Sequence, residues 1–312
     1  MGEYGCDGSV EREGLVAELV ARLLQAEVGE REVGVASAVP SEVHVEESII
    51  VPVAWVFMAS LKKNAEFIGG DVNPWALPKT FHYQNFITAF QDANMGTFFL
   101  NSVIVTAIAL LLLLVLALPA SYVLARFNFK GRKFLNGAFM AGLFVNINYI
   151  VVPIFLMLSS ANRALGVEFF LNNRFILAVI YATSALPFTI YLLSGYFKTL
   201  PKGFEEAAYI DGCGHFKTMT KIMIPMAKPS IITVILFNFL SFWNEYIIAY
   251  TLMDGNDTLA MGLKNLMAVE RTATNYGIMY AGLVIVMLPT LILYICVQKR
   301  LTEGMTLGGL KG

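Results

Sequence analysis

The chain has 312 residues, a net charge of −1, 57% hydrophobic residues and 14% charged residues, with a mean hydropathy of +0.64. Soluble domains carry about 25% charged residues, so this composition excludes a soluble globular protein and predicts an all-α polytopic membrane protein. The small net charge conceals an asymmetry: residues 1–48 hold 11 acids and 3 bases, a balance of −8, whereas residues 49–312 carry +7.

The segment 1–48 differs in character from the rest of the chain. Leucines and valines recur at helical spacing between residues 15 and 24 and predict one amphipathic helix. No basic stretch precedes an apolar core, so the pattern is not that of a signal peptide. We expect a divergent acidic N-terminal segment, and two interpretations stay open: a cytosolic accessory or lipid-surface helix, or a non-native or shifted start.

Charge-poor apolar runs then predict about six transmembrane helices. Their approximate ranges are 49–61, 93–125, 134–162, 175–196, 230–252 and 277–297. In the first, only the 14 residues 48–61 are free of charge. That is about 21 Å of helix against a hydrocarbon core of about 30 Å, so the first span is predicted to be short.

Two of these runs carry amides and an aromatic side chain that could contact a transported molecule. Asn146 and Asn148 lie in the third run, and Asn238, Trp243 and Asn244 lie in the fifth. Polar amides at membrane depth are costly unless they are paired, so they should face the bundle interior or a wet cavity. These five residues are the candidates for a substrate path, and hydrogen bonding between helices is the alternative.

The longest polar interval of the second half, residues 200–229, separates the fourth and fifth runs. Pro201 can open a helix over 204–210, and Gly212 stands where a left-handed residue usually ends one. A second helix is predicted over 215–224, ending at Pro225. The interval is therefore expected to be a helix–turn–helix loop between two spans, which suits a docking element.

The spacing within this loop is specific. Glu206-Ala207-Ala208, Gly212, Ile222 and Pro225 stand at the intervals of the EAA loop, and the sequence resembles the permeases of ABC importers that carry it. The resemblance implies that the loop faces the cytosol and fits a groove on an ATP-hydrolysing subunit. It assigns the coupling role to these residues: Glu205, Glu206, Ala207, Ala208, Gly212, Ile222 and Pro225.

The resemblance covers about residues 52–312 and is to sugar permeases of the maltose-importer type. The segments Ala59-Ser60-Leu61-Lys62 and Gly304-Met305-Thr306 fit that family's pattern. It implies a type I ABC importer transmembrane domain over 49–312, in a bacterial inner membrane, moving a sugar or oligosaccharide. The implied partners are ATPase subunits, a second homologous permease, an extracytoplasmic solute-binding protein and membrane lipid.

Loop charges agree with a cytosolic EAA loop. If residues 200–229 face the cytosol, inner loops after residue 61 hold 12 bases and outer loops hold 7. Short cytoplasmic loops are enriched in lysine and arginine, so the bias favours this orientation.

The sequence lacks the motifs of most alternative chemistries. It contains no phosphate-binding loop, no zinc-protease motif and no nucleophile elbow, and its three histidines and three cysteines show no ligand spacing. We therefore expect no enzymatic activity, no catalytic residue, no metal, no cofactor and no nucleic-acid partner. Two rival functions stay open: an ABC permease for a polyamine or amino acid, and an ion-coupled secondary transporter, which should show intramembrane carboxylates.

Overall fold

The computed structural model describes residues 42–68, 73, 75–91, 94–253, 258–269 and 275–309. The chain divides into two units, Met1–Trp55 and Val56–Gly312. The amphipathic helix expected near residues 15–24 lies outside the described residues. Helix α2 (Glu42–Ser60) runs through the boundary expected at residue 48, and the division at that point stays a prediction.

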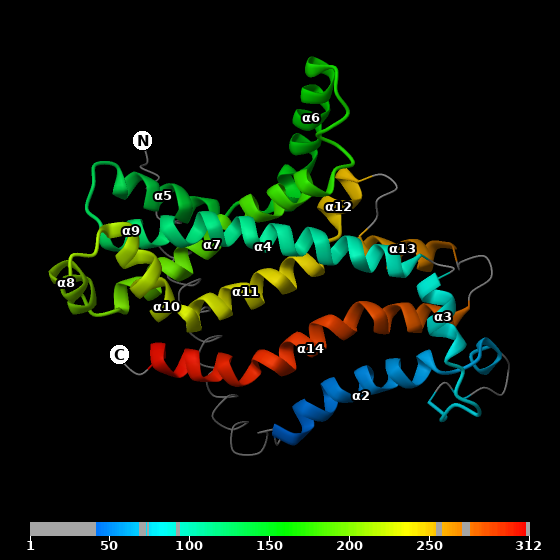
Figure 1. The fold of residues 1–312 in the computed structure, drawn as a ribbon. Helices are drawn as coiled ribbons and strands as arrows, with labels where there is room; N and C mark the ends of the chain where they lie inside the picture. Colours follow the sequence, from blue (N-terminus) through cyan, green and yellow to red (C-terminus); the bar gives the residue numbers. More distant parts are fainter. Residues whose placement is uncertain are drawn as a thin grey trace, which may run out of the picture. The chain divides into compact units, whose positions relative to one another are not determined.

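Every regular element in the described ranges is a helix, which confirms the all-α prediction (Figure 1). After α2 the order is η1 (Asn64–Glu66), α3 (Gln84–Gln91), α4 (Met95–Arg126), α5 (Arg132–Gly142), α6 (Ile147–Leu165), α7 (Arg174–Thr199), α8 (Gly203–Ile210), α9 (His215–Thr218), η2 (Met219–Met223), α10 (Ile224–Met226), α11 (Lys228–Trp243), α12 (Ile247–Leu252), α13 (Leu259–Val269) and α14 (Tyr276–Gly309).

Four helices in the described part are long and apolar enough to cross a membrane: α4, α6, α7 and the segment Tyr276–Cys296 of α14. A fifth results if the bent pair His215–Met226 and Lys228–Trp243 is counted as one span. The predicted second, fourth and sixth spans correspond to α4, α7 and α14. In the region of the predicted first span, the short apolar stretch is Val51–Ser60.

The predicted third span, 134–162, is interrupted. Helix α5 ends at Gly142, and α6 begins at Ile147 after an irregular stretch. Asn146 caps α6 by accepting a hydrogen bond from the Asn148 backbone N–H at 3.0 Å. The two pieces have different neighbours, because α5 packs on α7 whereas α6 packs on α12.

The predicted fifth span, 230–252, also ends early, at Trp243. Glu245 explains the break, because its carboxylate accepts from the backbone N–H groups of Ile248 at 2.9 Å and Ala249 at 3.2 Å. These are the free donors of the first turn of α12, so the acid starts a new helix. The same carboxylate accepts from the Tyr181 hydroxyl at 2.8 Å, which ties α12 to α7.

The core of the second unit is the long contact between α4 and α7, with α11 packed on both (Figure 1). Ala109, Leu113 and Ala117 of α4 and Leu193 of α7 have no exposed surface. Alanine on one helix permits the close backbone approach that stabilises helix pairs in membranes. Helix α14 packs on α11 and adds the next layer.

Near the start of α4, a set of contacts that we call the α3 junction joins Ser60, Lys62, Asn85 and Gly277. The buried Asn85 side chain donates to the carbonyl oxygens of Ser60 at 2.9 Å and Lys62 at 2.8 Å. A Cβ added at Gly277 would lie 2.6 Å from both the Lys62 carbonyl oxygen and the Asn85 Nδ2. Glycine is therefore what lets α14 begin against this junction.

Candidate functional site

The first helix of the loop, α8, ends in the way the sequence predicts. The Cys213 N–H donates to the Ala208 carbonyl at 2.8 Å, and the Gly212 N–H donates to the Tyr209 carbonyl at 3.1 Å. This pair of bonds is the Schellman motif, and Gly212 occupies its left-handed position with φ +76°. The chain consequently reverses at this glycine and returns toward the bundle.

The second helix of the loop does not end at Pro225, so that part of the sequence prediction is wrong. After α9, the π-helical turn η2 leads into α10, which contains Pro225 and ends at Met226. A π turn widens the backbone, which lets the helix continue through a residue that has no N–H. The change of direction comes instead at Ala227, where α11 leaves at 74°.

Helix α8 has two distinct faces. Glu205 and Ala208 are buried, whereas Glu206 and Ala207 are exposed and Ile210 is 87% exposed. The EAA residues are thus divided between a face that contacts the protein and a face that is open for a partner. Ala207 adds little bulk beside the Glu206 carboxylate, so a partner can approach that carboxylate closely.

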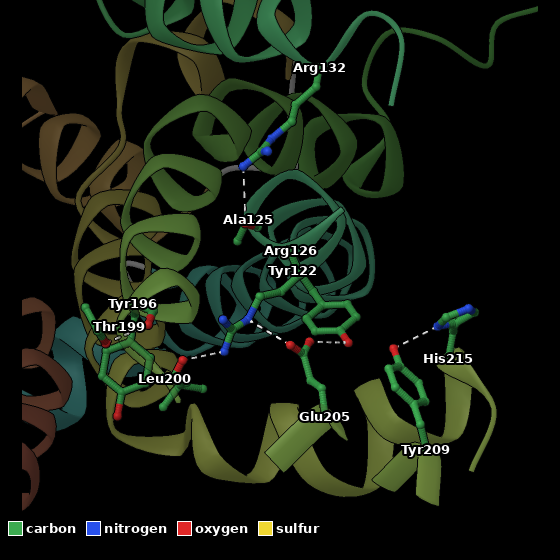
Figure 2. Close-up of polar contacts among 10 residues, drawn as sticks. All are labelled: Tyr122, Ala125, Arg126, Arg132, Tyr196, Thr199, Leu200, Glu205, Tyr209 and His215. Carbon is green, nitrogen blue, oxygen red and sulfur yellow. Dashed lines mark hydrogen bonds and ion pairs between the residues drawn. The ribbon is translucent and has the colours of Figure 1, made fainter. Parts of the chain in front are cut away.

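The buried face of α8 is held by a group that we call the anchor cluster: Tyr122, Arg126, Glu205 and the carbonyl of Leu200 (Figure 2). The Tyr122 hydroxyl donates to Glu205 Oε1 at 2.7 Å, and Arg126 Nε lies 3.5 Å from Glu205 Oε2. The Arg126 Nη2 also donates to the Leu200 carbonyl at 2.6 Å. Three segments, α4, α8 and the end of α7, therefore meet at one carboxylate and one guanidinium.

Other basic and aromatic side chains complete this end of the bundle. Arg132 donates from Nε to the Leu124 carbonyl at 2.9 Å. Its Nη2 donates to the Ala125 carbonyl at 3.2 Å (Figure 2). It thereby satisfies carbonyls of the last turn of α4, which lack helical partners. Tyr209 and His215 join the two halves of the loop through a 2.8 Å hydrogen bond.

The remaining loop residues of the sequence prediction lie on the second helix. Ile222 is half-buried and packs against the main core together with Ile224, whereas Pro225 is exposed. Their coupling role stays a prediction.

The five candidates for the substrate path fall into two groups. Asn238 and Trp243 are buried: Asn238 donates to Thr189 at 3.1 Å and to the Val234 carbonyl at 2.8 Å, and the Trp243 indole donates to the Val286 carbonyl at 3.1 Å. Asn146, Asn148 and Asn244 are exposed. The contacts of the buried pair favour packing between helices, and a path role for all five stays a proposal.

A groove between α5, α7 and α11 has a volume of about 870 Å³ and is lined by none of those five residues. Its polar lining includes Asn136, Ser194, Lys198, Thr199, Ser230 and Thr233. Sequence reasoning missed this groove, although the small hydroxyl residues of α7 and α11 within apolar runs were a visible signal. Within the part of the chain that the structure describes, no group of three or more histidine, cysteine or acidic side chains could hold a metal.

Known proteins identify the class of this bundle and loop. Residues 117–306 match the family described as "Binding-protein-dependent transport system inner membrane component". This region contains the anchor cluster, the loop and the helices around them. The chain belongs to this family: it is a multi-pass inner-membrane permease component of ABC transport systems, and it is not an enzyme.

Individual relatives agree. The chain is 35% identical to the diacetylchitobiose uptake system permease protein NgcG of Streptomyces coelicolor, over 83% of each chain. It is 28% identical to the trehalose transport system permease protein SugB of Mycobacterium tuberculosis, over 84% of this chain and 93% of that one. A solved bacterial ABC transporter involved in the import of the acidic polysaccharide alginate aligns with a TM-score of 0.71 at 25% identity, covering 87% of this chain and 97% of that one. The predicted family and type I importer fold are confirmed.

Proposed function

We propose that the chain is the permease subunit of an ABC importer that moves a sugar or oligosaccharide across the cytoplasmic membrane. Its partners are a pair of ATPase subunits, a second homologous permease and an extracytoplasmic solute-binding protein. The permease supplies the membrane path, and the loop of residues 200–229 receives the ATPase.

The single observation that carries the docking role is the division of α8 into two faces. Glu206 and Ala207 are exposed beside Ile210, while the neighbouring Glu205 is buried and bonded. An exposed carboxylate on a slim helical surface can accept charge-assisted hydrogen bonds from a partner groove. The exposed isoleucine adds apolar area that a partner would cover.

Carbohydrate cargo is supported by the named relatives, which include diacetylchitobiose, trehalose and arabinooligosaccharide permeases. The groove between α5, α7 and α11 adds hydroxyl and amide groups beside Tyr191, Phe139 and Phe237. Polar groups among aromatic side chains suit an uncharged, hydroxyl-rich ligand. The groove is therefore a second candidate for the path, beside the five residues named from the sequence.

Glu206→Ala tests the docking role. A charge-assisted hydrogen bond contributes about 1.5–3 kcal/mol, so the affinity of the ATPase subunit should fall about tenfold to a hundredfold. Affinity is measured with the purified permease pair in nanodiscs, and uptake is measured in vesicles that contain the whole importer. Glu168→Ala removes another exposed acid, outside the loop, and should change neither quantity. Unchanged ATPase affinity for Glu206→Ala would disprove the docking role.

Uptake in the same vesicles tests the cargo. Neutral di- and oligosaccharides should be imported with the cognate binding protein, whereas amino acids and polyamines should not. Asn136→Ala in the groove and Asn238→Ala between helices then distinguish the two candidate paths. A changed apparent sugar affinity with normal assembly marks the path, and reduced assembly with unchanged affinity marks packing.

A further inference from the structure

The two adjacent acids of α8 face opposite ways. Glu206 lies on the exposed face, whereas the side chain of Glu205 is 12% exposed and turns toward α4 (Figure 2). If the exposed face binds the ATPase, the buried acid contacts the part of the molecule that has to respond. Glu206 would therefore bind the partner, and Glu205 would transmit the partner's displacement to the helices of the bundle.

We propose that Tyr122, Arg126 and Glu205 are positioning residues that carry a displacement of α8 into α4 and α7. This role rests on the proposed function, because α8 can transmit a displacement only if the ATPase subunit binds it. It differs from docking, since none of the three side chains lies on the exposed face of α8.

The anchor cluster connects segments that the chain itself connects only distantly. Tyr122 and Glu205 are 83 residues apart, and Arg126 and Leu200 are 74 residues apart. Arg126 contacts both Glu205 and the carbonyl at the end of α7, so one guanidinium bridges α8 and α7 from α4. A movement of α8 consequently displaces α4 and α7 together.

The chemistry of the cluster makes this connection stiff. The side chains of Arg126 and Glu205 are 7% and 12% exposed, so water competes little for either charge. The Tyr122–Glu205 and Arg126–Leu200 hydrogen bonds, at 2.7 and 2.6 Å, each involve an ionised group and are short and directional. Arg126 and Glu205 themselves form an ion pair at 3.5 Å, and removing one charge of that pair leaves the other buried without compensation. Beyond the cluster, α4 and α7 pack on each other through fully buried side chains. The two helices should therefore move as one rigid unit when α8 is displaced.

The other connection from α8, along the chain to α11, is bent. It passes through the π-helical turn Met219–Met223 and then through Ala227, where the helix axes differ by 74°. Bends of this kind absorb changes in backbone angle, so a displacement that enters α9 need not reach α11 undiminished. The anchor cluster is the direct route.

Glu205→Gln and Tyr122→Phe test this inference in the complete reconstituted importer. Glutamine keeps the size of the side chain and an oxygen that can accept from Tyr122, but removes the charge that faces Arg126. We expect the affinity for the ATPase subunit to be unchanged, while sugar transported per ATP hydrolysed falls about tenfold, because the buried Arg126 charge loses its opposite charge. Tyr122→Phe combined with Glu205→Gln should be no worse than the stronger single change, because both act on one contact.

Ser121→Ala is the matched control. It removes a buried hydroxyl one residue from Tyr122, and that hydroxyl donates to the Leu118 carbonyl of the same helix at 3.0 Å. Its transport ratio should equal that of the unchanged protein. If Glu205→Gln loses ATPase affinity in parallel with transport, the cluster serves only to fold α8 and the inference is overturned. Full coupling in Glu205→Gln overturns it as well. An effect of Glu206→Ala on docking in the same assay shows that the proposed function holds independently.

Discussion

The anchor cluster at the end of α4 and the α3 junction near its start both join segments that are far apart in the sequence. They do so with different chemistry. The anchor cluster uses a carboxylate, a guanidinium and a phenol. The α3 junction uses one neutral amide, two backbone carbonyls and a glycine, at a position where the surrounding atoms leave no space for a Cβ.

This difference suggests a division of labour between the ends of the bundle. Close packing around a neutral amide defines one geometry and tolerates little displacement. A charged pair beside an exposed helix holds that helix firmly while the helix keeps a free face for a partner. We infer that the α3 junction is the fixed end of the bundle and the anchor cluster is the driven end.

The membrane topology of the loops should give the largest effect, because each reporter fusion lies on one side of the membrane or the other. Reporter domains fused after Lys130 or Lys217 should be cytosolic, and one fused after Asn172 should be external. The expectation follows from the excess of bases in the loops near the anchor cluster. Alkaline phosphatase and green fluorescent protein fusions provide complementary readouts. An external Lys217 would place the anchor cluster on the outer side of the membrane, where no ATPase subunit could bind, and would contradict its assignment as the driven end.

Gly277→Ala should be the most destabilising point change. The new Cβ would lie 2.6 Å from the Lys62 carbonyl oxygen, and backbone there cannot move aside as a flexible side chain could. Overpacking of this kind costs about 3 kcal/mol. Equilibrium unfolding in mixed detergent micelles measures the change in free energy. Gly137→Ala is the control, because nothing lies within 4 Å of its new Cβ, and equal stability of the two variants would contradict the close packing.

Asn85→Asp should destabilise the same junction by a smaller amount. The amide donates to two carbonyl oxygens, and a carboxylate of the same shape would instead repel both. Leaving buried acceptors without a donor costs about 2 kcal/mol. The exposed neighbour Gln84 offers the control Gln84→Glu, which should unfold at the same detergent fraction as the unchanged protein. If both variants behave alike, the amide is not what holds the junction.

Gly212→Ala should produce the smallest effect, at the driven end. Nothing lies within 4 Å of the new Cβ, so the only cost is a left-handed backbone conformation, about 1 kcal/mol. ATPase affinity should fall about fivefold if the turn is fixed in the docked state. Gly214→Ala is the matched change, because its Cβ also meets open space and its φ is −72°. Equal affinities for the two variants would show that the turn geometry does not matter for docking.

Sequence patterns predicted the features that depend on local chemistry. The charge-free runs located α4 and α7, and the loop spacing located Gly212 in its left-handed position. The breaks before Ile147 and Ile247 could not be predicted, because apolar periodicity continues across both. Each break depends on an asparagine or glutamate that caps the next helix, and such a residue in an apolar run looks like a ligand contact.

The burial of Glu205 against α4 also could not be predicted from the sequence. Two adjacent acids in an EAA loop look equivalent, and the partners that distinguish them lie about 80 residues earlier in the chain. Tyr122 and Arg126 stand four residues apart in the last turns of α4, which places them on one face of that helix. That spacing could have predicted that the two side chains share a partner, but it does not indicate which acid they contact.

The length of α14 has a consequence for the geometry of the whole importer. The helix has 34 residues, about 51 Å at 1.5 Å per residue, against a hydrocarbon core of about 30 Å. Its start is fixed at the α3 junction, where the Tyr276 N–H donates to Asn64 and Gly277 lies against Lys62. The surplus therefore emerges at the opposite end, the end that also carries α8 (Figure 1). If the EAA loop faces the cytosol, about 20 Å of α14 exceeds the hydrocarbon core on the side where the ATPase pair would bind.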